Sequence, residues 1–236
     1  MSDFLDFSRS KVLNNIPNKK LQNYIQNIEA SNDNIQTKQV KITAINRYAE
    51  SNIPIDYWAL KMDKDFQGDS RLFTKYNEYI EDIKNSYLTG SSICFAGNHG
   101  TGKTMTVSNI LKQATHKGFS ALYTTLSDIV NALTSGPNEE KFLARRELTM
   151  VDFLVIDEFD PRFMSNDNAA DLYARSLESI FRTRSQNKLP TLMCTNSPNV
   201  VESFTGPLKA SVDSLMKGYL KVFPVFGEDF RKRASK

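Results

Sequence analysis

A glycine-rich stretch, GNHGTGKT, extends from Gly97 to Thr104. It matches the pattern G-x-x-x-x-G-K-[ST], in which glycines let successive backbone N–H groups point at phosphate oxygens. In this pattern Lys103 would reach the β- and γ-phosphates of a nucleotide, and the hydroxyl of Thr104 would bind Mg²⁺. The stretch therefore predicts a phosphate-binding loop. The residues expected to contact the nucleotide are Gly97, Asn98, His99, Gly100, Thr101, Gly102, Lys103, Thr104 and Met105.

Two adjacent acidic residues, Asp157 and Glu158, follow an apolar run at 153–156. Packing alone gives no reason for such a pair at the end of a buried strand. Ligands of α/β sheets bind at the carboxyl ends of the strands. There Asp157 would hold Mg²⁺ through its water shell, and Glu158 would act as general base on an attacking water. An acidic strand end that only faces solvent is the alternative.

Three further polar residues could take part in the same chemistry. Asn196 ends an apolar run at 191–195 and could orient a water near the γ-phosphate, although such an Asn is also a common turn residue. Arg231, within the segment DFRKR, is either a site residue or part of a solvated basic tail. We expect His99, at a variable position of the loop, to be a tolerated loop residue rather than a catalyst.

The segments around these residues predict alternating strands and helices. Expected strands lie at 92–96, 120–125, 152–156, 190–195 and 221–226. Expected helices begin near residue 70 and lie at 103–117, 127–134, 139–149 and 168–185. This alternation predicts an α/β fold in which helices flank a parallel sheet. Pro224 places the last strand at an edge or a bulge, because proline cannot donate to a neighbouring strand.

The first 50 residues are polar, and their scattered apolar positions predict one or two short amphipathic helices. The segment at 31–34 is expected to form a turn or linker. We therefore divide the chain into a helical region at 1–50, which would bind a partner, and a core at 51–236 that holds the motifs.

Composition narrows the class of protein. The chain has 236 residues, 40% of them apolar, which is enough for a sizeable core, and its net charge of +3 is too small to indicate a nucleic-acid partner. Cys94 and Cys194 lie in strand-like runs and are expected to be buried thiols rather than a disulfide or zinc ligands. No apolar run reaches ~18 residues, and the N-terminus has no secretory signal pattern. These features predict a cytoplasmic protein without contact to membranes.

Together the motifs resemble those of the AAA+ ATPases, in particular the DnaC/DnaI-type replicative helicase loaders and the related IstB transposition helpers. GNHGTGKT is similar to their Walker A loop, FLVIDEFD to their Walker B strand and TLMCTN to their sensor 1 strand. GYLKVFPVFGEDFRKR resembles their C-terminal signature, and SNIPIDYWALKM resembles the segment that introduces their ATPase core. The resemblance extends roughly from Asn52 to Arg233.

This resemblance implies an ATPase that uses ATP and Mg²⁺, with Lys103 and Glu158 as catalytic residues. It also implies that Asn196 is sensor 1 and Arg231 is sensor 2. It places the segment with Tyr57 and Trp58 near the adenine base, whereas the residue types alone favour core packing.

The implied function is that of a helicase loader. Such a protein binds a DnaB-like hexameric replicative helicase through its N-terminal region and helps to place it on single-stranded DNA, assembling into a homo-oligomer with ATP. An IstB-like helper of transposition and a DnaA-like initiator or adaptor are the alternatives.

One departure from the loaders concerns the arginine that acts in trans on a neighbour's nucleotide. The stretch before the last strand, 208–217, contains lysines but no arginine. Lysine lacks the planar fork of a guanidinium. Lys209, Arg182 or Arg184 would have to serve, or hydrolysis in trans is impaired. The sequence therefore predicts weak hydrolysis without a partner.

Overall fold

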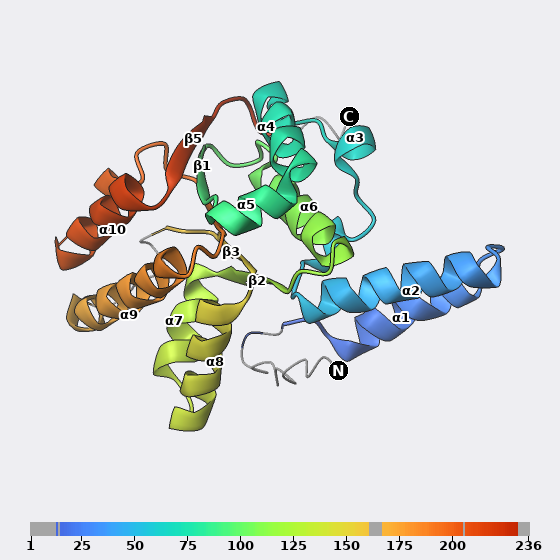
Figure 1. The fold of residues 1–236 in the computed structure, drawn as a ribbon, viewed down its shortest axis with the longest axis horizontal. Helices are drawn as coiled ribbons and strands as arrows, with labels where there is room; N and C mark the ends of the chain where they lie inside the picture. The colour runs from blue at the N-terminus through green and yellow to red at the C-terminus, as the bar shows by residue number, and fades with distance from the viewer. Residues whose placement is uncertain (1–12, 14, 161–166, 205, 231–236) are drawn as a thin grey trace.

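The structure, a computed structural model, describes residues 13, 15–160, 167–204 and 206–230. A five-stranded sheet in the order β2-β3-β4-β1-β5 forms its centre, and all neighbouring strands are parallel (Figure 1). The strands are β1 (Ile93–Gly97), β2 (Ala121–Thr125), β3 (Phe153–Asp157), β4 (Thr191–Thr195) and β5 (Lys221–Val225). The predicted α/β fold with a parallel sheet is confirmed, and each strand overlaps its predicted range.

Helices connect the strands and cover both faces of the sheet (Figure 1). They are α1 (Asn18–Glu29), α2 (Ile35–Glu50), α3 (Met62–Asp65), α4 (Ser70–Glu81), α5 (Ile83–Thr89), α6 (Lys103–His116), α7 (Leu126–Thr134), α8 (Asn138–Met150), α9 (Asp167–Gln186) and α10 (Gly206–Gly218). Two short 3₁₀ turns lie at Ile55–Tyr57 and Val201–Ser203. The sequence did not predict α5 as a separate helix, nor α10, whose Gly-Pro start gives a weak helical signal.

Side chains of each strand alternate between two apolar layers. In β1, Cys94 packs in the layer that includes buried residues of α7, α8 and α9, whereas Phe95 packs in the layer beneath α4 and α6. Cys194 is also buried, in the second layer, so the two cysteines lie on opposite faces as free thiols. Burial raises the pKa of the Cys94 thiol to about 12, which keeps it protonated and unreactive.

The two edges of the sheet are protected in different ways. β5 is an edge strand, as predicted from Pro224, whose missing N–H removes one donor from the exposed edge. At the opposite edge the N–H of Tyr123 in β2 donates to the carbonyl of Ser51 over 2.8 Å. The amide nitrogen of Asn52 donates to the carbonyl of Tyr123 over 2.9 Å, and its amide oxygen accepts from the N–H of Asn15. Asn52 has a φ of 52°, a left-handed conformation that asparagine tolerates better than most residues.

Helices α1 and α2 form a hairpin that extends away from the sheet (Figure 1). The turn predicted at 31–34 joins them, and Asn34 caps α2 by accepting the N–H of Thr37 over 2.8 Å. The end of α2 is anchored, because Tyr48 is buried and its hydroxyl is hydrogen-bonded to Nε2 of His116 at the end of α6. The start of α2 is open, with Ile35 86% and Val40 64% exposed.

Candidate nucleotide site

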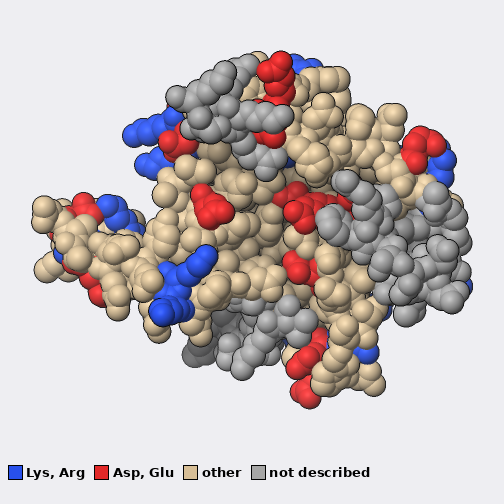
Figure 2. All heavy atoms as spheres, turned by 180° about the vertical axis from the view of Figure 1, so that it is seen from behind, with Lys and Arg blue, Asp and Glu red and all other residues tan. Residues whose placement is uncertain are grey.

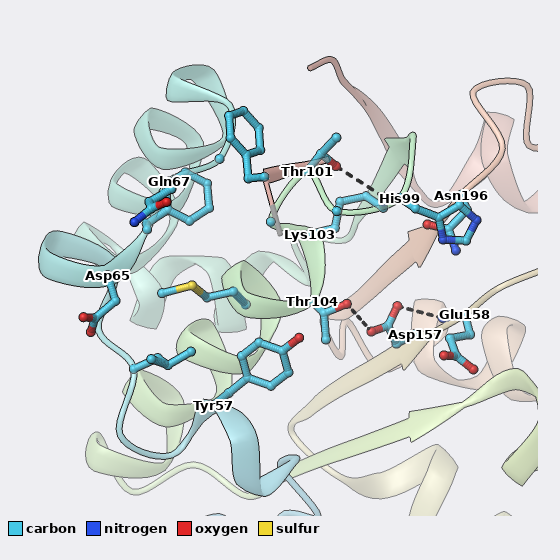
Figure 3. A pocket seen from close by; sticks show the side chains of 17 residues that line it. Tyr57, Asp65, Gln67, His99, Thr101, Lys103, Thr104, Asp157, Glu158 and Asn196 are labelled. Atoms are coloured by element: carbon cyan, nitrogen blue, oxygen red, sulfur yellow. Dashed lines mark hydrogen bonds between the residues drawn. The ribbon is translucent and has the colours of Figure 1, made fainter. Parts of the chain in front are cut away.

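A cavity of about 410 Å³ opens at the carboxyl ends of β1, β3 and β4. Its volume lies within the range typical of small-molecule sites. Figure 3 shows the side chains around it. The cavity is lined by Tyr57, Leu60, Asp65, Phe66, Gln67, Gly68, His99, Gly100, Thr101, Gly102, Lys103, Thr104, Met105, Asp157, Glu158, Asn196 and Phe230.

The glycine-rich loop runs from the end of β1 to the start of α6, as the sequence predicts. Gly100 and Gly102 have φ values of 71° and 95°, which other residues rarely adopt. A Cβ at Gly100 would lie 1.8 Å from Oδ1 of Asp229, and a Cβ at Gly102 would lie 2.5 Å from the ring of Phe66. Both positions therefore require glycine for space as well as for backbone conformation. The loop directs the N-terminal end of α6, with its positive dipole, toward the cavity.

Lys103 lies inside the loop and is only 5% exposed. Its Nζ donates to the carbonyl oxygen of Gly97 over 2.8 Å and to that of Asn98 over 2.6 Å. The ammonium group is thus held by the backbone of the loop itself, beside the cavity (Figure 3). This position puts a positive charge next to the loop that the sequence assigns to phosphate.

Three donors fix the carboxylate of Asp157. The hydroxyls of Thr104 and Tyr123 each donate to Oδ2 over 2.7 Å, and the backbone N–H of Glu158 donates to Oδ1 over 2.7 Å. Burial and the neighbouring Asp157 carboxylate raise the pKa of Tyr123, so its hydroxyl keeps its proton and remains a donor. The oxygens of Thr104 and Asp157 are of the type that binds Mg²⁺ together with phosphates. The sequence did not predict that Tyr123 contacts Asp157, because nothing in the pattern of β2 distinguishes this tyrosine from a packing residue.

Glu158 directly follows the buried strand β3 and is exposed toward the cavity. Its φ of 51° is a strained left-handed conformation that turns the chain at the end of the strand. Burial raises the pKa of Glu158, the negative charges of Asp157 and Asp128 raise it further, and His99 opposes them. A carboxylate with a raised pKa is a better proton acceptor, as a general base requires.

Asn196 lies at the end of β4 and lines the cavity near Glu158 (Figure 3). His99 also lines the cavity. Arg231, the other predicted sensor, lies outside the described residues. The residue before it reaches the loop, because the N–H of Phe230 donates to the carbonyl of Gly100 over 3.1 Å.

The two aromatic residues of the IPIDYW segment take different positions. Trp58 is 3% exposed, its ring contacts that of Tyr24 edge-on, and its Nε1 donates to the carbonyl of Ile53 over 2.8 Å. Tyr57 lines the cavity, on the side away from Glu158 and Asn196 (Figure 3). Trp58 is therefore a core residue, whereas Tyr57 belongs to the wall of the site.

The three residues considered for action on a neighbouring molecule's nucleotide differ in how deeply they are buried. Arg184 is fully buried, and it donates to Thr191 Oγ1 and to the carbonyls of residues 148, 151, 152 and 190. The expectation that it could act in trans is wrong, because its guanidinium cannot reach a neighbouring molecule. Arg182 and Lys209 remain at the surface, where they form ion pairs with Glu178 and Glu202.

We expect Arg184→Met to destabilise the fold by about 3–5 kcal/mol, because several buried carbonyls would lose their donor. Arg182→Met, two residues earlier on the same helix, removes an exposed ion pair and should cost less than about 1 kcal/mol. Urea unfolding followed by circular dichroism measures both. Equal free energies of unfolding for the two variants would contradict the structural role of Arg184.

Charged side chains are distributed unevenly over the face shown in Figure 2. Acidic residues gather near the middle of this face, and Lys and Arg lie in separate small groups. The described part of the chain contains no cluster of three or more His, Cys, Asp or Glu residues suited to a metal ion. Among its described helices, none has the length and apolar character needed to cross a membrane.

Comparison with known proteins shows which proteins this chain resembles. Residues 93–209 match the family described as ATPase family associated with various cellular activities (AAA). The chain is 30% identical over 175 residues to the replicative helicase loader DnaC of Escherichia coli K12, covering 72% of this chain and 66% of the relative. It therefore spans about two thirds of the length of the curated relatives that it matches.

Two solved structures show the same fold. The crystal structure of DnaI aligns with a TM-score of 0.59 at 16% identity, over 75% of this chain and 93% of that one. The replication initiator DnaA bound to AMPPCP and single-stranded DNA aligns with a TM-score of 0.57 at 16% identity, over 75% of this chain and 51% of that one. The family match begins at the first residue of β1 and includes the glycine-rich loop, β3 and β4, which are the elements that build the cavity. Residues 93–209 belong to the AAA family of ATPases, and the chain is similar to the replicative helicase loaders.

Proposed function

We propose that this protein is an ATP-dependent helicase loader, which binds a hexameric replicative helicase and helps to place it on single-stranded DNA. The observation that carries this proposal is the 30% identity to the helicase loader DnaC over 175 residues. The cavity supports it, because its phosphate-type loop and its paired acidic residues suit ATP.

The site residues divide into binding and catalytic roles in this proposal. The loop amides and Lys103 would hold the phosphates, with Nζ exchanging its carbonyl contacts for phosphate oxygens. Thr104 and Asp157 would hold Mg²⁺, which when bound offsets negative charge on the phosphates. Glu158 would accept a proton from the attacking water, and Asn196 would orient that water. Arg231 would contact the γ-phosphate as sensor 2.

The predicted division of the chain near residue 50 would separate a partner-binding region from the nucleotide site. The α1–α2 hairpin is held at one end and exposes apolar side chains at the other, which suits docking on the helicase. The core would contact single-stranded DNA when several copies assemble with ATP. The separate small groups of Lys and Arg in Figure 2 fit such an assembly, in which neighbouring copies add their groups together.

The hairpin gives a direct test of the partner. In a variant with Ile35→Asp and Val40→Asp, we expect affinity for a purified DnaB-type helicase to fall at least about tenfold, because two exposed apolar contacts are replaced by charges. The matched control is Leu88→Asp on α5, which is 67% exposed and lies outside the hairpin. Biolayer interferometry with the intact chain measures all three proteins.

The outcome separates the alternatives. If the hairpin variant binds the helicase as tightly as the unchanged chain, the docking surface lies elsewhere. If the unchanged chain binds no helicase but does bind ATP, the role as a transposition helper replaces that of a loader.

A further inference from the structure

A lysine in the middle of α6 is buried although it has no acidic partner among its hydrogen bonds. Lys112 is 5% exposed, and its Nζ donates to the carbonyl oxygens of Tyr57 over 3.0 Å, Trp58 over 3.3 Å and Leu60. An ammonium group has three donors, so these three carbonyls use its full capacity. Burial lowers the pKa of Lys112 to about 8, which leaves it mostly charged at pH 7.

The three acceptors all belong to the segment that forms one wall of the cavity. This segment follows the 3₁₀ turn Ile55–Tyr57, and residues 58–61 belong to no helix or strand. Carbonyls at the end of a helical turn lack partners within it and need donors from elsewhere. Lys112 supplies these donors, and the side chains of Tyr57 and Leu60 line the cavity.

The same helix holds the opposite side of the site. α6 begins with Lys103 in the glycine-rich loop, and Lys112 lies nine residues further, about 13 Å along the helix axis. Figure 3 shows Tyr57 on one side of Thr104, with Glu158 and Asn196 on the other. One rigid element therefore sets the separation between the phosphate loop and the wall that carries Tyr57.

We propose that Lys112 is a positioning residue for the nucleoside part of the bound nucleotide. It holds the 57–60 wall at a fixed separation from the phosphate loop, so that base and ribose fill the space between them. It makes no contribution to the binding of phosphates, which the loop and Lys103 provide. This inference rests on the proposed nucleotide site and names a residue that supports recognition of the base.

A comparison of two ligands tests the role of Lys112. We expect Lys112→Met to weaken ATP binding about tenfold, because the wall loses its charged donor, and to leave the affinity for inorganic tripolyphosphate unchanged. Lys112→Gln keeps donors for part of the wall and should show a smaller loss. Lys117→Met, an exposed lysine just after the same helix, is the matched control and should match the unchanged chain for both ligands. Isothermal titration calorimetry at pH 7 with Mg²⁺ measures the affinities, and circular dichroism confirms that each variant is folded.

Each outcome has a distinct meaning. If a folded Lys112 variant keeps the ratio of ATP to tripolyphosphate affinity of the unchanged chain, Lys112 does not position the wall. If both Lys112 variants fail to fold, Lys112 supports the whole core and the inference is overturned. If the unchanged chain binds neither ligand, the proposed nucleotide site itself fails. If the unchanged chain binds tripolyphosphate as tightly as ATP, the assignment of the loop to phosphate is upheld. The 57–60 wall then has no role in binding the base and ribose, and the inference is overturned.

Discussion

Glu158→Gln should reduce ATP turnover by about 10²–10⁴-fold while leaving ATP affinity unchanged. The amide keeps the size and shape of the carboxyl group but cannot accept a proton from water. Glutamine can also take the same backbone position, so Asp157 keeps the N–H donor that it receives from residue 158. The test is to measure ATP affinity and turnover on the same preparation. Turnover equal to that of the unchanged protein would remove Glu158 from the catalytic role.

A neighbouring variant makes this test sharper. The charge of Asp128 contributes to the raised pKa of Glu158, so Asp128→Asn should lower that pKa without removing the base. A base with a raised pKa loses activity as the pH falls through that raised value. The acid limb of the turnover profile should therefore move to lower pH in Asp128→Asn, with turnover at pH 8 nearly unchanged. An unmoved acid limb would show that another group controls it.

Lys103→Ala should weaken ATP binding by about 100-fold, because two charge-assisted hydrogen bonds to phosphate oxygens would be lost. In the structure this ammonium is already beside the loop, held by the carbonyls of Gly97 and Asn98. To bind ATP, the Lys103 ammonium group therefore needs only to exchange these carbonyl oxygens for phosphate oxygens. Titration with a fluorescent ATP analogue measures the loss.

The control for Lys103 is Lys117→Met, which removes an exposed lysine just after the far end of α6 and should leave ATP affinity unchanged. Circular dichroism should show that both variants keep their helical content. If Lys103→Ala binds the analogue as tightly as the unchanged chain, the assignment of the loop to phosphate is wrong.

The sequence was sufficient to predict the sheet because each strand lies in a short, largely apolar run, and three of these runs end at a residue type with a distinct role. Gly97, Asp157 and Asn196 mark the ends of β1, β3 and β4, and parallel strands bring such ends together. Helix α10 was not predicted, because its apolar spacing follows a Gly-Pro pair that favours a turn.

The parts of the site that could not be predicted from the sequence depend on contacts between distant segments. Tyr123 reaches Asp157 across 34 positions, and Lys112 reaches Leu60 across 52. A tyrosine in a strand or a lysine in a helix has many possible surroundings, and its own neighbours in sequence do not select one. Arg184 shows the same limit, because a surface position suited to trans contact and a fully buried position give the same local pattern.

Asn52 meets three structural requirements at once. Few other residues could replace it without loss of a contact. The position needs a left-handed backbone, an acceptor for the N–H of Asn15 and a donor for the carbonyl of Tyr123. Glycine meets the first requirement only, and aspartate has no donor for the third. We therefore expect substitutions on the exposed surface of the hairpin to be tolerated better than substitutions of Asn52, since glycine and aspartate each leave at least one of the three requirements unmet.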